Sequence, residues 1–231
     1  MNLSNELLAL IFMCTYMLCA VGFYKLGKVW LQNFLVISYV ITLCITGKFF
    51  DFFGLTATAG IITYAGLFLA TDMLTERYGK KAGFETVRIG FVVSLIFVVM
   101  TQATLLFSPV PFAQDLSESM NVVFGSSLRI MTAGFAVYLF AQHFDVWLYH
   151  KIHEFCEGRH LWVRNIGSTL SSQLLDTVLF FTLAFWGTMP FNQFLEIMVV
   201  GFTLKAAIAL IDTPFIYFAK KITPLDCKDT N

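Results

Sequence analysis

The sequence predicts an all-α membrane protein, a polytopic bundle of about seven transmembrane helices. Of its residues, 58% are hydrophobic and only 13% are Asp, Glu, Lys or Arg, whereas a soluble domain carries about 25% charged residues because its surface stays in water. Apolar runs of about 20 residues recur from end to end, which is the length that a helix needs to cross ~30 Å of hydrocarbon. Outer-membrane barrels are built from alternating segments of about 10 residues, and the sequence does not show that alternation.

Seven hydrophobic segments are predicted to span the membrane. Their connections are short and no linker divides the chain, so one transmembrane domain is expected over residues 1–231. Within it we expect an additional N-terminal helix at 5–24, a core at 29–219 and a short cytoplasmic tail at 220–231. The predicted spans are residues 5–24, 29–47, 55–75, 88–108, 123–149, 165–187 and 194–219.

Two local features bear on the first and fourth of these segments. The first span lacks a basic flank and a small-residue cleavage site, so it is interpreted as a retained helix rather than a signal peptide. Pro109 and Pro111 end the fourth span, because proline cannot continue a helix.

The basic residues predict the orientation. If the N-terminus lies outside and the connections alternate, 12 of the 15 basic residues gather on one side, which the positive-inside rule assigns to the cytoplasm. Six or eight spans would mix the two sides. The chain is therefore expected in the inner (plasma) membrane with its C-terminus inside. The twelve are Lys25, Lys28, Arg77, Lys80, Lys81, Arg88, Lys151, Arg159, Arg164, Lys220, Lys221 and Lys228.

The sequence gives little support for metal or nucleotide chemistry. The five cysteines form no C-x-x-C pair, and three of them lie in apolar spans as small hydrophobic residues. His143, His150 and His153 do not have the spacing of a zinc motif such as H-E-x-x-H. No Gly-rich phosphate loop is present, so ATP hydrolysis by this chain, a bound metal and a cofactor are not expected. A net charge of zero gives no argument for direct contact with nucleic acid.

Charged residues inside the predicted spans are the main functional candidates. A charge near the centre of a membrane helix is costly unless it is paired or lines a wet cavity. Each such residue therefore belongs either to a functional site or to an ion pair that locks two helices together. These residues are Arg129, Lys205, Asp72, Glu76, Asp145, Asp176 and Asp212.

The sixth span carries a polar face. Ser168, Ser172 and Asp176 are spaced by four residues and so form one stripe on a helix, which Thr169, Gln173 and Thr177 widen. Packing between helices through small polar residues explains the serines and threonines. It does not explain Gln173 and Asp176, which need partners for several donors or acceptors.

The third span ends with two acids on one side. Asp72 and Glu76 are four residues apart, and Gly79 is expected to cap the helix, with Arg77 and Lys80 at the negative end of its dipole. The capping and anchoring roles account for the glycine and the basic residues but not for the acids. Asp72 and Glu76 are therefore predicted to form a cytoplasmic gate or a proton-carrying pair.

Motifs in these segments resemble those of the queuosine precursor transporter family, also known as vitamin uptake transporters. The resemblance covers residues 29–219, and the first span is similar to an N-terminal addition found in part of the family. The chain departs from the family at Thr46-Gly47-Lys48, where the family often has Asn. The resemblance rests on residues 67–79 (LFLATDMLTERYG), Arg129, 142–147 (QHFDVW), 161–165 (LWVRN), 168–177 (STLSSQLLDT), Lys205 and 212–214 (DTP).

The resemblance implies a transporter core that imports 7-deazaguanines such as preQ0, preQ1 or queuine for queuosine in tRNA. It also implies likeness to the six-helix substrate-binding subunits of energy-coupling-factor transporters, so a binding subunit that needs ATPase partners is an alternative. An integral-membrane enzyme using His143, Asp145 and His150 is a third interpretation, from a different class. The implied partners are the small-molecule substrate and the lipid bilayer, and homo-oligomer formation is left open.

The residue chemistry fits such a ligand. A guanine-like edge presents two adjacent N–H donors beside a carbonyl acceptor, so one carboxylate can accept both donors while an amide or a cation serves the carbonyl. Asp176 with Gln173 and either Arg129 or Lys205 supplies that set, and Trp147, Trp162 and Phe180 are candidates for stacking. The predicted substrate-binding residues are Asp176, Gln173, Ser172, Arg129, Lys205, Asp72, Glu76, Trp147 and Asn165.

Overall fold

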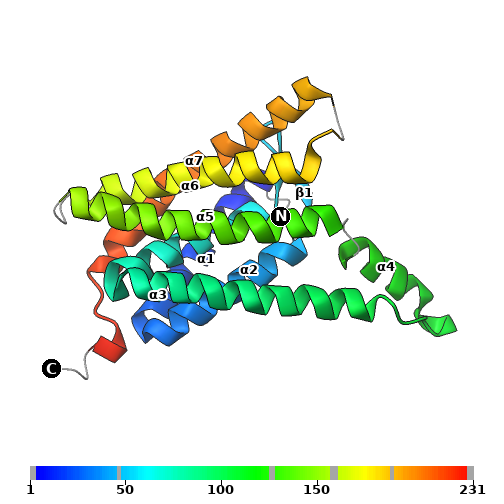
Figure 1. Ribbon diagram of the computed structural model, residues 1–231, viewed down its shortest axis with the longest axis horizontal. Helices are drawn as coiled ribbons and strands as arrows, with labels where there is room; N and C mark the ends of the chain where they lie inside the picture. Colours follow the sequence, from blue (N-terminus) through cyan, green and yellow to red (C-terminus); the bar gives the residue numbers. More distant parts are fainter. Residues whose placement is uncertain (1–3, 46–47, 125–127, 157–160, 188–189, 228–231) are drawn as a thin grey trace.

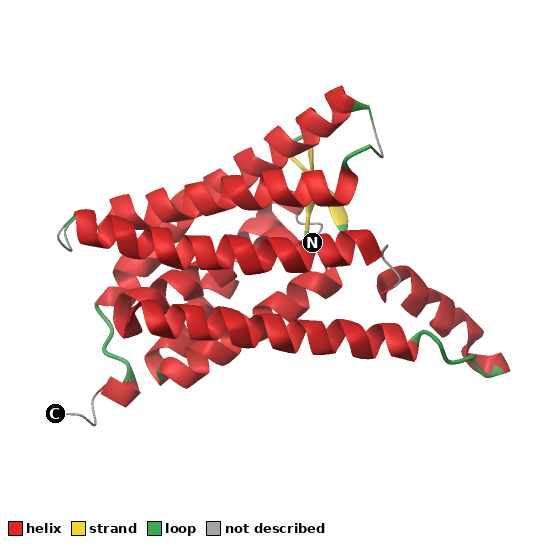
Figure 2. Ribbon diagram, in the orientation of Figure 1, coloured by secondary structure: helices red, strands yellow, loops and turns green. Residues whose placement is uncertain are grey.

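The computed structural model describes residues 4–45, 48–124, 128–156, 161–187 and 190–227, and it is a bundle of long helices with one small hairpin (Figure 1, Figure 2). The predicted all-α membrane class is confirmed. The helices are α1 Asn5–Leu26, α2 Lys28–Ile45, α3 Gly60–Thr104, α4 Gln114–Phe124, α5 Leu128–Phe155, α6 Leu161–Phe185 and α7 Phe191–Lys220; the strands are β1 Phe49–Phe52 and β2 Leu55–Thr58; single 3₁₀ turns lie at Pro111–Ala113 and Leu225–Cys227.

Helix α3 contains two of the predicted spans. Its 45 residues would extend about 67 Å at 1.5 Å per residue, roughly twice the hydrocarbon thickness. Gly79 interrupts the helix with φ 82° and ψ 170°, a left-handed conformation that glycine adopts without a Cβ clash. Residues 60–78 and 80–104 are therefore two helices that meet at Gly79, where the sequence predicts a helix cap. In Figure 1 the second of them runs back along the bundle from this turn.

The predicted start of the third span at residue 55 is wrong, because residues 49–58 form an antiparallel hairpin. Phe49 pairs with Thr58, and Phe52 pairs with Leu55. The turn residues Phe53 and Gly54 have φ values of 55° and 77°, as a two-residue type I′ turn requires. The apolar run Leu-Thr-Ala-Thr reads as part of a helical span in the sequence, yet its threonines also favour a strand.

The fifth predicted span is shifted toward the C-terminus. A separate short helix, α4, occupies residues 114–124, and α5 runs to Phe155 instead of ending at residue 149. Within the described residues, five helices are long and apolar enough to cross a membrane, and they include α1, α2, α3, most of α6 and most of α7. Helix α5 is long enough but more polar, because Gln142, His143 and Asp145 lie in its middle.

The two described ends of the chain lie at opposite ends of the bundle. The Asn5 side-chain amide donates to the Asp51 carbonyl oxygen of the hairpin at 3.2 Å. The backbone amide of Lys28, where α1 turns into α2, donates to the Asp226 carboxylate at 2.7 Å. An odd number of crossings requires this separation. The predicted spans correspond to α1, α2, the two halves of α3, α5, α6 and α7.

Candidate functional site

Asp176 on α6 is held by side chains from two other helices. Lys205 on α7 forms an ion pair with Oδ2 of Asp176, and the Tyr64 hydroxyl on α3 donates to Oδ1. The Lys205 ammonium group also lies 5.0 Å from the centre of the Tyr64 ring, which attracts a cation through its π face. Asp176 is only 4% exposed. Both oxygens of a buried carboxylate are thus occupied by donors.

The polar stripe of α6 faces the inside of the bundle, as its spacing predicts. Ser168, Ser172 and Asp176 are all buried, and so are the flanking Thr169, Gln173 and Thr177. The stripe does not serve one site, however. Ser172 donates to Asp145 at 2.8 Å rather than contributing to the environment of Asp176. Buried Gln173 has an Oε1 without a donor among the described residues.

Aromatic residues from α2 and α5 lie close to this cluster. The rings of Tyr39 and Tyr138 stack at 3.7 Å with 25° between their planes. The Tyr39 hydroxyl donates to the Gly134 carbonyl oxygen at 3.1 Å, and Asp176 lies near enough for its charge to act on Tyr39. The stacked tyrosines thus provide an apolar surface beside the Asp176–Lys205 pair.

The tyrosines differ from the stacking residues that the sequence suggests. Trp147 is 42% exposed and packs its ring against Phe144 at 5.8 Å, and Trp162 is also exposed. Tyr64 was missed by sequence reasoning. The available signal was its position eight residues before Asp72, which places both residues on one face of the first half of α3.

Asp72 and Asp145 form a second buried cluster between α3, α5 and α6. Thr169 donates to Asp72 at 3.2 Å, and Ser172, one turn along α6, donates to Asp145 at 2.8 Å. Because Thr169 and Ser172 lie one turn apart on α6, the two carboxyl groups that they contact are neighbours. Between α3 and α5, Thr71 also donates to the Gln142 side-chain oxygen at 3.0 Å.

Glu76 has different partners from Asp72, although the two were predicted to act as a pair. The Lys220 ammonium group lies 3.1 Å from Glu76 Oε1, and the Tyr149 hydroxyl donates to Oε2 at 3.1 Å. A cavity of about 80 Å³ opens beside this ion pair, lined by Tyr24, Met73, Glu76, Arg77, Ile216, Ala219 and Lys220. Glu76 thus belongs to the end of the bundle that also holds the C-terminal turn, while Asp72 is enclosed within it.

Four positions singled out in the sequence lie outside the part that the structure describes in detail. Arg129 belongs to α5 and Asn165 to α6, but their side chains are outside the described residues. The same holds for Thr46 and Gly47, where the sequence departs from the family pattern.

His143 lies apart from His150 and His153, whose rings stack at 6.1 Å. His143 Nδ1 lies 2.7 Å from the Leu139 carbonyl oxygen, and its ring stacks on Phe84. His150 lies 3.5 Å from Glu154 near the helix end. Among the described residues, no three His, Cys, Asp or Glu side chains gather where they could hold a metal ion.

Comparisons with known proteins extend these observations. The family described as "Putative vitamin uptake transporter" matches residues 58–219. A Bacillus subtilis (strain 168) protein named "Probable queuosine precursor transporter" is 38% identical over 181 residues, which cover 78% of each chain. The "Queuosine precursor transporter" of Escherichia coli (strain K12) is 26% identical over 166 residues, covering 68% of this chain and 70% of that protein.

A "Probable queuosine precursor transporter" of Haemophilus influenzae (strain ATCC 51907 / DSM 11121 / KW20 / Rd) is 28% identical over 186 residues, covering 77% of this chain and 74% of that protein. No solved structure matches the chain. The matched residues 58–219 contain both buried carboxyl clusters and leave α1 and α2 outside. The match covers most of the chain, and its identity to the first of these relatives extends over most of both proteins. The chain therefore belongs to the "Putative vitamin uptake transporter" family.

Proposed function

We propose that this protein imports queuosine precursors, 7-deazaguanines such as preQ0, preQ1 or queuine, across the inner membrane. The observation that carries the proposal is the buried carboxylate of Asp176, held by a lysine and a tyrosine, in a chain whose relatives are named for that cargo. A carboxylate with two accepting oxygens matches the two adjacent N–H donors of a guanine-like edge. We propose Asp176 as the residue that recognises this edge.

Lys205 is the proposed partner of the ligand's carbonyl group. Its ammonium group forms an ion pair with Asp176 and lies over the Tyr64 ring. A cation is thus next to the place where the guanine-like edge is proposed to bind. The stacked Tyr39 and Tyr138 rings offer a π face for the heterocycle, as aromatic side chains do in many nucleobase sites. Gln173, whose Oε1 has no donor among the described residues, is the proposed acceptor for a further ligand N–H group.

In this arrangement, protein groups occupy the positions proposed for the ligand's donors. Tyr64 and Lys205 each fill one oxygen of Asp176, so a deazaguanine must displace both in order to donate to the carboxylate. A buried carboxylate without donors is costly, and this exchange keeps it satisfied before and after binding. Lys205 is released at the same step and becomes available to the ligand's carbonyl oxygen.

We further propose that the end of the bundle that carries Asp226 faces the cytoplasm. Lys28, which donates to Asp226, and the Glu76–Lys220 ion pair lie at this end, together with the predicted majority of basic residues. The positive-inside rule then places the hairpin and α4 outside. A cysteine-labelling experiment with Cys introduced at Asp115 and at Lys221 tests this orientation, because only an exterior cysteine reacts with an impermeant reagent.

Uptake of radiolabelled preQ0 by cells that lack their own carrier tests the function. Cells expressing this chain alone should accumulate preQ0, and unlabelled preQ1 or queuine should compete. Asp176→Asn should abolish uptake, because it replaces one of two accepting oxygens by a donor, whereas exposed Asp115→Asn on α4 should not. Uptake near the wild-type level in Asp176→Asn, with normal amounts of protein in the membrane, would refute the assignment.

A further inference from the structure

Two buried carboxyl groups from α3 and α5 contact neighbouring residues of α6, and none of the described cations forms an ion pair with either. Asp72 on α3 is 2% exposed and Asp145 on α5 is 0% exposed, and the two are brought together by hydroxyls one turn apart on α6. Each uses one oxygen to accept a hydroxyl from the same stretch of α6, Thr169 for Asp72 and Ser172 for Asp145. The other oxygen of each, Asp72 Oδ1 and Asp145 Oδ2, has no donor among the described residues.

Three described lysines form ion pairs with other carboxylates. Lys205 pairs with Asp176, Lys220 with Glu76, and Lys28 with Glu85. No described lysine, arginine or histidine lies within ion-pair distance of Asp72 or Asp145, and Asp212 on α7 adds a third carboxyl group whose charge acts on Asp72. Two neighbouring carboxylates in a low-dielectric interior cannot both stay ionised without a cation. A single proton between them gives a donor to the oxygens that lack one.

We infer that Asp72 and Asp145 share one proton and that this proton is the coupling ion for transport. The inference rests on the proposed function, because it gives the driving force for the uptake assigned to the Asp176 site. The step is a proton transfer: an O–H bond forms at one carboxyl group when the pair faces outside. The same bond breaks to water when the pair opens to the cytoplasm, so one proton enters with each substrate.

The alternative ion for such a site is sodium, and the backbone argues against it. Sodium sites in transporters use carbonyl oxygens of unwound helices. Among the described residues, the non-helical dihedral angles inside α3 fall at Gly79, two turns beyond Asp72. The Thr169 hydroxyl also donates to Asp72, as it would toward a carboxyl–carboxylate pair.

The pair lies one helical turn from a cavity and has a link to the substrate site. The cavity of about 80 Å³ beside Glu76 and Lys220 is lined by Met73 and Glu76 of α3, and it is large enough to hold water. In the other direction, Ser172 is one helical turn before Asp176 on the same face of α6. A small rotation or shift of α6 would therefore change both sites together.

Other titratable groups surround the pair and must be separated from it in any pH experiment. His143 lies on the same helix as Asp145, two residues before it. The described groups on the elements packed around the pair are Tyr64 and Glu76 on α3, His143 and Tyr149 on α5, Asp176 on α6, Lys205, Asp212 and Lys220 on α7, and Tyr24 on α1.

Purified protein in liposomes tests the inference with preQ0, whose nitrile substituent carries no titratable amine. We compare accumulation under an inward pH gradient, accumulation under an inward Na⁺ gradient at equal pH, and exchange of external label for internal preQ0 without any gradient. The wild type should accumulate preQ0 under the pH gradient, up to about tenfold per pH unit for one proton per substrate. It should not accumulate it under Na⁺.

Asp72→Asn and Asp145→Asn should separate coupling from binding. Each imitates the protonated carboxyl group, so exchange should stay within about twofold of the wild type while accumulation driven by the pH gradient is lost. His143→Gln, which leaves the pair intact, should still accumulate preQ0. Accumulation driven by Na⁺ alone, or undiminished accumulation under the pH gradient in both Asn variants, overturns the inference.

Infrared spectroscopy of the ligand-free protein reads the proton directly. The wild type at neutral pH should show a protonated carboxyl band that is lost in Asp72→Asn and in Asp145→Asn but kept in Asp115→Asn. Absence of the band in the wild type refutes the shared proton even if transport is seen. Conversely, a wild type that shows the band but no preQ0 exchange refutes the proposed function and the coupling role, while the proton site itself stands.

Discussion

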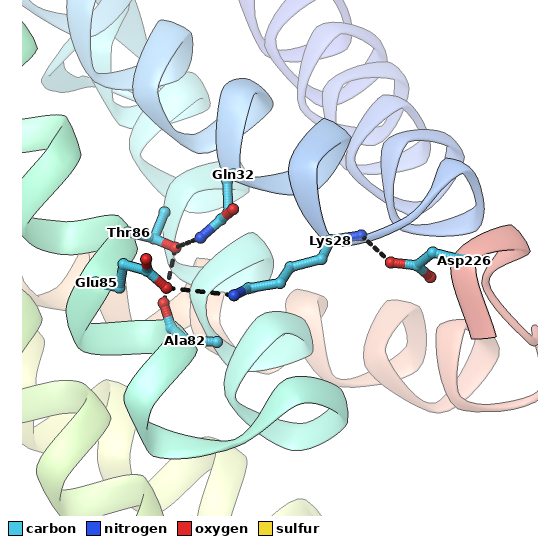
Figure 3. Close-up of polar contacts among 6 residues, drawn as sticks. All are labelled: Lys28, Gln32, Ala82, Glu85, Thr86 and Asp226. Carbon is cyan, nitrogen blue, oxygen red and sulfur yellow. Dashed lines mark hydrogen bonds and ion pairs between the residues drawn. The ribbon is translucent and has the colours of Figure 1, made fainter. Parts of the chain in front are cut away.

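The carboxylate of Asp226 accepts a hydrogen bond of 2.7 Å from the backbone amide of Lys28, 198 residues earlier in the chain (Figure 3). Its other oxygen accepts the Tyr78 hydroxyl at 2.9 Å, next to the turn at Gly79. The Lys28 side chain reaches Glu85 on the second half of α3 at 3.2 Å. The C-terminal turn thus fastens the start of α2 to the turn between the two halves of α3.

Asp226→Asn should lower the melting temperature of the purified protein. The amide keeps one acceptor but loses the charge that caps the first turn of α2, and an exposed charged hydrogen bond contributes about 1 kcal/mol after screening. The measurement is thermal unfolding in detergent. Asp115→Asn on the exposed face of α4 is the matched control, and equal melting of the two variants would show that the Asp226 contacts add nothing.

Gly27→Ala should be more harmful than Gly22→Ala. Gly27 has a φ of +118°, and a Cβ atom there would lie 2.7 Å from the Asp226 side chain, whereas a Cβ at Gly22 meets nothing within 4 Å. The strained backbone alone costs about 1–3 kcal/mol. An alanine at Gly22 in the helix interior should be neutral or gain up to about 1 kcal/mol. The two melting temperatures decide the comparison, and a smaller loss at Gly27 would contradict the contact with Asp226.

Lys205→Met should destabilise the protein as well as block uptake. It leaves Asp176 as a buried carboxylate with Tyr64 as its remaining described donor, and breaking a buried ion pair costs about 3–5 kcal/mol. The double variant Lys205→Met with Asp176→Leu removes the unpaired charge and should recover most of the stability without recovering uptake. Melting and preQ0 uptake measured on the same preparations separate the two roles. Failure of the double variant to recover stability would mean that the pair itself is not the cause.

Tyr64→Phe should lower the stability of the protein measured without ligand and raise its affinity for preQ0. The hydroxyl is a donor to Asp176 that a ligand must displace, so its loss costs the empty protein about 1–2 kcal/mol and leaves one carboxylate oxygen open. The rise in melting temperature on adding preQ0 should therefore be larger than in the wild type. Tyr138→Phe is the matched control, because the buried Tyr138 hydroxyl has no hydrogen-bond partner among the described residues. A smaller ligand-induced rise in Tyr64→Phe than in Tyr138→Phe would contradict the displacement step.

The inward face of α6 was predictable, whereas the two sites that it serves were not. A spacing of four residues places Ser168, Ser172 and Asp176 on one face whatever the helix packs against, and the structure buries all three. The partners of that face come from α3, α5 and α7, at sequence separations of 27 to 112 residues. Periodicity within one helix carries no information about which residue of another helix stands opposite.

The hairpin at residues 49–58 shows that hydropathy alone can assign strand residues to a helical span. Its run of Phe, Leu, Thr and Ala satisfies the hydropathy of a span, so composition alone extends the third helix through it. The consecutive left-handed residues Phe53 and Gly54 reverse the chain, and Asp51 closes the turn by accepting the Gly54 amide at 3.2 Å. Phenylalanine rarely adopts the left-handed conformation, so the residue type at position 53 did not predict the turn.

Apolar length, periodicity and local backbone preferences, which all act within a few residues, were enough to predict a membrane bundle, the approximate positions of its spans, a helix end at Gly79 and the polar faces. The packing of the helices was needed to show that Lys205 and Tyr64 meet at Asp176, and that Asp145 rather than Glu76 lies beside Asp72. Those pairings depend on the rotation and depth of each helix in the bundle, which the packing of all the helices sets together.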